Sequence, residues 1–200
     1  MKIKDVLCKD KQLDKLIRQI GDEPLSRINN NGKVFDHLIN AILSQQLSTK
    51  VAKVIAERFW NKIGNKKQKI DTIINLDIEE LRLCGLSYQK GNYVKNIANF
   101  WKEHNIKDKD FETMEDGEIL KKLTQIKGVG NWTAEMVLMF CLGREDVFSH
   151  DDYGIQVAMK KIYKLESSGK ELKEAMIKKS SKWKPYRTYA CMYLWAFKDA

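Results

Sequence analysis

The amino-acid sequence predicts an all-α fold. Apolar residues recur at helical spacing through most of the 200 residues, strand-like alternation is nearly absent, and the chain contains only two prolines. A hydrophobic content of 43% is enough for one large core or two small ones. The expected connections are short and no fixed-period repeat is evident, so we expect a compact protein without a disordered linker.

The helices are expected in the following order. Residues 34–60 hold a pair of helices, and Ser48 is placed to cap the second of them. Residues 70–86 hold two short helices, with Asp77 as an N-cap and Gly85 as a stop. Helical spacing then continues in residues 88–104, 116–126, 131–143, 151–163, 169–183 and 185–197.

Two glycines one residue apart separate two apolar runs in the stretch LTQIKGVGNWTAEMVLMF, residues 123–140. We expect a helical hairpin whose turn is too tight for a side chain at Gly128 or at Gly130, with Val129 filling the gap between the helices. Unpaired backbone N–H groups at the start of the second helix would then be open to an anion such as a DNA phosphate. An ordinary turn that binds nothing would explain the same residues.

Charge gives the first indication of a partner. The 36 basic side chains outnumber the 27 acidic ones and give a formal net charge of +9, which suits a polyanion. A plain bias toward lysine would give the same excess, since acidic residues are interleaved and there is no polybasic tail. Charge alone therefore leaves nucleic-acid binding as one of two interpretations.

The cysteines and the N-terminus bear on the cellular environment. The cysteines lie singly with no CxxC pair, which argues against a zinc ribbon and a clustered iron–sulfur site and favours reduced intracellular thiols. The N-terminus lacks a long apolar core and a small-residue cleavage site, and no stretch is long and apolar enough to cross a bilayer. We expect a protein of the cytoplasm or nucleoid, without a membrane partner. The cysteines are Cys8, Cys84, Cys141 and Cys191.

Four motifs carry a resemblance to a known family. AILSQQLSTKVAKVIAERFW, LRLCGLSYQKGNYVKNIA, the hairpin stretch LTQIKGVGNWTAEMVLMFCLGREDVFSHDDYGI and WKPYRTYACMYLW resemble segments of the helix-hairpin-helix DNA glycosylases, in their 3-methyladenine (alkylpurine) branch. The motifs stand in the family's order and span residues 34–197. The resemblance implies a monofunctional glycosylase of base excision repair, which hydrolyses the N-glycosidic bond of 3-methyladenine or 7-methylguanine in a flipped-out nucleotide and leaves an abasic site.

The same resemblance implies an architecture and a partner. Two helical lobes would enclose a cleft: residues 34–115 with the hairpin region 116–145 would form the middle lobe, and the N-terminal segment with residues 150–200 the other. The expected partner is double-stranded DNA with damaged bases, bound by a monomer. No cofactor is expected, although carbonyls of Ile126 and Val129 could hold a structural Na⁺ or K⁺.

The resemblance places the catalytic carboxylate at Asp152. Breaking an N-glycosidic bond builds positive charge on the sugar, so a fixed anion stabilises that state and can take a proton from water. Asp151 is expected to be a helix cap instead. In isolation, both aspartates could be plain caps. His150 stands where relatives often have a proline or a small residue, and it could touch DNA or tune Asp152, or be an ordinary exposed histidine.

The resemblance also indicates the reaction type and the base pocket. Lyase members carry a nucleophilic lysine at the position of Trp132, whose indole cannot form a Schiff base, so a monofunctional enzyme is expected. Trp132, Tyr153 and Trp195 are the expected pocket walls, because electron-rich rings attract cationic alkylpurines. Met136 falls where one family member has a pocket tyrosine, which would leave a pocket that is either more open or differently selective. Core packing is the alternative for each aromatic residue.

DNA contacts complete the expected site. A flipped base leaves a gap in the stack, and Gln46, with Gln45 beside it, aligns with the family's wedge. A polar helix end satisfied by its own backbone would explain these glutamines equally well. Gly128, Gly130 and Thr133 would bind phosphate through backbone N–H groups or a hydroxyl.

Other functions remain open from the sequence. A glycosylase for oxidised or deaminated purines would share the motifs, and a non-catalytic helix-hairpin-helix protein would share the basic hairpin; abasic-site formation would distinguish the latter. Trp132 and the scattered cysteines disfavour an iron–sulfur lyase. A helical adaptor would explain the periodicity but not four ordered motifs.

Overall fold

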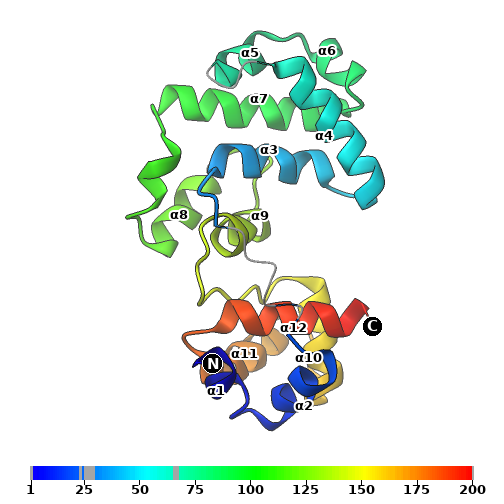
Figure 1. The fold of residues 1–200 in the computed structure, drawn as a ribbon, viewed down its shortest axis with the longest axis vertical. Coiled ribbons are helices and arrows are strands. Elements are labelled where there is room, and N and C mark those ends of the chain that lie inside the picture. Colours follow the sequence, from blue (N-terminus) through cyan, green and yellow to red (C-terminus); the bar gives the residue numbers. More distant parts are fainter. Residues whose placement is uncertain (1, 23, 25–29, 65–67, 200) are drawn as a thin grey trace. The chain divides into compact units, whose positions relative to one another are not determined.

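The computed structural model describes residues 2–22, 24, 30–64 and 68–199, and all regular structure in these residues is helical (Figure 1). The all-α prediction is therefore confirmed. The chain forms two compact units. The central unit is Asn31–Val137, and the terminal unit combines Met1–Asn30 with Leu138–Ala200. The boundary falls within residues 116–145, a region that the sequence analysis assigns to the middle lobe.

The central unit is built around α3 and α7, which pack against each other, with α4 on α3 and the short α5 and α6 on α7 (Figure 1). Phe35, Trp101 and Phe111 form its aromatic core, with ring centroids 5.5 and 5.8 Å apart. The elements are α3 (Val34–Ser44), α4 (Thr49–Ile63), α5 (Lys69–Asn75), α6 (Ile78–Leu83), α7 (Tyr88–Glu103), a 3₁₀ turn (Asp108–Phe111), α8 (Asp116–Leu123) and α9 (Asn131–Met136).

The local signals for these helices are confirmed. The Ser48 side chain accepts a hydrogen bond from the Val51 N–H and caps α4. Asp77 caps α6 in a capping box with Glu80, and Gly85 follows that helix with a φ of +103°. These caps satisfy backbone N–H groups that would otherwise lack a partner at the helix start.

The terminal unit packs α12 against α2 and α10 (Figure 1). Trp183 and Tyr193 are completely buried in its core, and the Trp183 indole donates to Asp10, the N-cap of α2. The elements are α1 (Lys2–Leu7), α2 (Lys11–Ile20), α10 (Tyr153–Tyr163), α11 (Gly169–Ser180), a 3₁₀ turn (Ser181–Trp183) and α12 (Arg187–Asp199).

Residues 131–143, expected as one helix, differ from the prediction. The α-helix ends at Met136, and a π-helical turn follows in Val137–Cys141. Its end is closed by a hydrogen bond from the Arg144 N–H to the Leu138 carbonyl, 2.9 Å. The boundary between the two units falls inside this π-helical turn.

The described residues bear on three further questions: the state of the cysteines, membrane-spanning helices and metal-binding groups. The four cysteines are free thiols. Within the described part of the chain, no helix is long and apolar enough to cross a membrane, and no three or more His, Cys, Asp or Glu side chains gather into a group that could hold a metal ion.

Candidate active site and nucleic-acid interface

The hairpin joins α8 to α9 through a short turn. Val129 is 5% exposed, which is consistent with a side chain packed at the turn. Its N–H donates to the Ile126 carbonyl, 2.9 Å. Gly128 has a φ of +108°, and a Cβ there would lie 2.3 Å from the Tyr93 ring of α7, so a side chain is excluded.

The prediction for Gly130 is wrong. Its φ is −92°, which any residue adopts, and a Cβ would meet nothing within 4 Å. Gly130 is the N-cap of α9 and is exposed, without a side-chain cap. The tight turn therefore depends on Gly128 alone, and open space at Gly130 leaves the start of α9 accessible.

Alanine substitutions should separate the two glycines. We expect Gly128→Ala to lower the free energy of unfolding by about 1–3 kcal/mol, because alanine would meet the Tyr93 ring in a left-handed backbone conformation. Gly130→Ala, the matched control, should change it by less than about 0.5 kcal/mol. Urea unfolding of both variants measures the difference; equal losses would contradict the steric assignment.

Helix α7 anchors the hairpin turn. The Asn96 amide donates to the Lys127 carbonyl, 3.0 Å, and Gln89 donates to the Tyr93 hydroxyl, 2.6 Å. Lys127 itself is exposed. Thr133 is only 4% exposed, so this predicted phosphate contact has almost no surface to offer.

The predicted wedge lies on the turn after α3. Gln45 is the C-cap of α3, and the exposed Gln46 has a φ of +57°. Lys90 of α7 donates to the carbonyls of Leu43 and Gln45, 3.0 and 2.8 Å. Burial lowers the pKa of Lys90. The helix end is therefore satisfied by a lysine distant in the sequence, and that lysine holds the turn that presents Gln46.

A cavity of about 860 Å³ opens beside this turn, entirely within the central unit. It brings together four predicted site residues: Gln45, Gln46, Trp132 and Met136. Trp132 is 45% exposed, whereas Met136 is 8% exposed. The other lining residues come from α3 (His37, Asn40, Ala41, Ser44) and from α4 (Thr49, Ala52, Lys53, Ala56).

The chemistry of this cavity combines an indole with rotatable polar groups, which is typical of a ligand pocket. His37 is half-buried, and burial lowers its pKa, so its imidazole is neutral at neutral pH. His37 and Asn40 were missed by sequence analysis because they are single polar residues on a mostly apolar helix and belong to no motif.

Asp152 lies in the terminal unit, at the start of α10. It is the N-cap: its Oδ1 accepts from the Ile155 N–H, 2.8 Å, and also from the Trp195 indole N–H of α12, 2.8 Å. The Trp195 ring also lies 6.0 Å from the Phe140 ring. Trp195, predicted as a pocket wall, is thus a hydrogen-bond partner of the carboxylate, and both bonds fall on one oxygen.

The prediction that Asp151 caps the helix is wrong, because Asp152 holds that position. Asp151 instead pairs with Lys173 of α11, 2.5 Å, and contacts His150 Nδ1, 3.2 Å. The Lys173 ammonium lowers the pKa of Asp151. His150 therefore contacts Asp151, while Tyr153, the first residue of α10, is 76% exposed.

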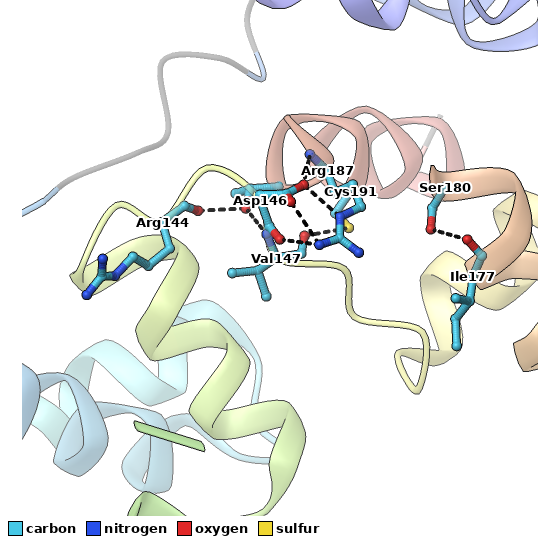
Figure 2. A network of polar contacts seen from close by, with 8 residues as sticks. Arg144, Asp146, Val147, Ile177, Ser180, Arg187 and Cys191 are labelled. Carbon is cyan, nitrogen blue, oxygen red and sulfur yellow. Dashed lines mark hydrogen bonds and ion pairs between the residues drawn. The ribbon is translucent and has the colours of Figure 1, made fainter. Parts of the chain in front are cut away.

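A polar network fastens the segment before Asp152 to the start of α12 (Figure 2). Arg187 donates from Nε and Nη2 to the two carboxylate oxygens of Asp146, 2.6 and 2.9 Å, and from Nη2 to its carbonyl, 2.9 Å. Thr188 donates to the Arg144 carbonyl and accepts from the Val147 N–H. Helix α12 thus holds this segment through Arg187 and Thr188, and Asp152 through Trp195.

The two features that bear on the class of protein are the glycine hairpin in the central unit and the carboxylate at the start of a helix in the terminal unit. Residues 39–185 match HhH-GPD, the superfamily of base excision DNA repair proteins, and the chain belongs to this family.

Particular relatives are similar over most of the chain. DNA-3-methyladenine glycosylase 1 of Schizosaccharomyces pombe is 34% identical over 189 residues, 93% of this chain and 82% of that protein. The Bacillus subtilis protein YfjP is 35% identical over 168 residues, 81% of this chain; the match spans only 58% of that relative. The solved structure of S. pombe 3-methyladenine DNA glycosylase (Mag1) with abasic DNA has a TM-score of 0.84 at 32% identity, covering 100% of this chain and 98% of Mag1.

Proposed function

We propose that this protein is a monofunctional DNA glycosylase that hydrolyses the N-glycosidic bond of alkylated purines, 3-methyladenine and 7-methylguanine, and leaves an abasic site. The observation that carries the proposal is the Asp152 carboxylate, fixed through one oxygen by Trp195 and the Ile155 N–H. The similarity to proteins named 3-methyladenine glycosylases supports the substrate class.

Asp152 would act on the sugar. As the bond to the base breaks, positive charge develops on the deoxyribose, and a carboxylate already held in place stabilises it without reorganisation. The same group would accept a proton from the attacking water. Hydrogen bonds from the Ile155 N–H and the Trp195 indole to Oδ1 fix the orientation of the carboxylate.

The cavity of the central unit would receive the base. The exposed face of Trp132 suits a cationic alkylpurine through cation–π attraction, about 0.5–2 kcal/mol. The neutral imidazole of His37 adds no repulsion. Since Trp132 occupies the lysine position of lyases, no Schiff base would form and the strand would stay intact.

DNA would be bound through the hairpin and the α3 turn. The open start of α9 at Gly130 would approach a phosphate, and Gln46 would fill the gap left by the flipped nucleotide. Carbonyl oxygens such as those of Ile126 and Val129 are suitable ligands for Na⁺ or K⁺, which would order the turn. The protein would act as a monomer on duplex DNA in the cytoplasm or nucleoid.

The test is to incubate the protein with duplex DNA containing 7-methylguanine or 3-methyladenine, and to measure free base and strand breaks before and after hot alkali. Release of methylpurine with breaks only after alkali is expected. Breaks without alkali would contradict the monofunctional assignment. Release of oxidised or deaminated purines alone would show that these bases, and not alkylated purines, are the substrates. DNA binding without release of any base would indicate a non-catalytic protein.

A further inference from the structure

One side chain of the cavity is held in a fixed orientation by a residue outside the lining. The Trp60 indole N–H of α4 donates to the amide of Asn40 on α3, 2.8 Å. An indole only donates, so the Asn40 atom facing Trp60 must be the carbonyl oxygen. Asn40 lines the cavity and Trp60 does not. Asn40 is exposed, and the bond from Trp60 leaves its amide NH₂ as the end available to a bound ligand.

The partner of Asn40 is itself held in place. The Trp60 ring packs edge-on against Phe59, with centroids 5.1 Å apart, and Phe59 is completely buried. The hydroxyl group of Thr49 in the cavity can rotate to donate or accept, whereas that of Ser44 donates to the Ala41 carbonyl, 3.0 Å. The Asn40 amide cannot exchange its two ends without losing the Trp60 bond, so it presents donors only.

We propose that Asn40 is a specificity-determining residue which favours alkylated guanine over alkylated adenine; this rests on the proposed function. Guanine carries the O6 acceptor at the ring position where adenine carries the N6 amino donor. An amide NH₂ would pair with O6, whereas opposite an amino group two donors would face each other and remain unpaired. Donors that a bound base buries and leaves unpaired weaken binding more than a missing attraction does.

Three substitutions separate this role from a simple brace between α3 and α4. Asn40→Leu removes the donor. Asn40→Asp keeps an oxygen for Trp60 but puts a second acceptor in place of the NH₂, which would pair with the adenine amino group. Trp60→Phe keeps the packing on Phe59 and frees the amide to flip. Asn99→Leu, at an exposed position of α7 outside the cavity, is the matched control.

The experiment measures single-turnover rate constants for release of 7-methylguanine and 3-methyladenine by the full chain, with the ratio normalised to the unsubstituted protein. We expect Asn40→Leu to lower this ratio roughly tenfold, corresponding to one hydrogen bond. Asn40→Asp should reverse the preference toward 3-methyladenine, Trp60→Phe should lower the ratio partway, and Asn99→Leu should leave it unchanged.

The outcomes distinguish a failure of the specificity role of Asn40 from a failure of the proposed glycosylase function. If Asn40→Leu and Asn40→Asp slow both bases equally, or leave the ratio unchanged, the pair is only a brace and the specificity role is overturned. Should Asn40→Leu fail to fold, the reversal in Asn40→Asp decides the question alone. If the unsubstituted protein releases neither base, both the proposed function and the role of Asn40 are contradicted. If it releases both bases and the Asn40 variants keep the same ratio of release, only the role of Asn40 is overturned.

Discussion

Asp152→Asn is expected to slow base release by roughly two to four orders of magnitude while duplex binding is retained. The asparagine amide has nearly the shape of the carboxylate, and its oxygen can still accept from the Ile155 N–H and the Trp195 indole. The helix cap therefore survives, and what is lost is the negative charge beside the sugar. Single-turnover release from methylated duplex DNA, with binding followed by fluorescence anisotropy, measures the two effects separately.

Asp151→Asn is the matched control, since it removes the same charge one residue earlier. Asp151 pairs with Lys173, and the substitution breaks that partly exposed pair. We expect its rate to stay within about threefold of the unsubstituted protein and its stability to fall by less than about 1 kcal/mol. A large loss of rate in Asp151→Asn with activity retained in Asp152→Asn would exchange the roles of the two aspartates.

Arg187→Met is expected to give the largest loss of stability among the substitutions considered, about 2–4 kcal/mol. Arg187 makes bidentate and backbone contacts to Asp146, and the two side chains are 22% and 33% exposed. Methionine keeps the aliphatic volume but leaves a partly desolvated carboxylate without its cation. Because solvent partly screens this pair, the expected loss of stability is smaller than for a fully buried ion pair. Chemical denaturation monitored by circular dichroism measures it.

Arg82→Met tests whether any arginine pair would do the same. Arg82 pairs with Glu79 one turn away on the surface of α6, with side-chain exposures of 42% and 61%. Such a pair contributes about 0.2–1 kcal/mol. A similar loss of stability in both variants would show that the contact between Arg187 and Asp146 contributes no more than an exposed ion pair. Replacing Asp146 together with Arg187 should recover part of the loss, because no uncompensated charge then remains.

The sequence by itself determined the helices and several of their ends. Ser48 and Asp77 cap helices as predicted because a cap acts on N–H groups only two or three residues away. The spacing of apolar residues three and four positions apart likewise predicts the buried face of a helix from residues that are close in the sequence. The hairpin and the all-α class followed from the same local signals, and the ordered motifs indicated the family before any geometry was known.

Only the tertiary structure decided which groups meet. Asp151 and Asp152 have different surroundings because Lys173 pairs with Asp151 and the Trp195 indole donates to Asp152, and both partners arrive from other helices. The need for glycine at position 128 is set by Tyr93 of α7, and the orientation of Asn40 by Trp60 of α4. Helix formation and helix caps depend on neighbours within a few residues along the chain, whereas clamps and pockets depend on side chains brought together by packing, so their partners cannot be read from local sequence.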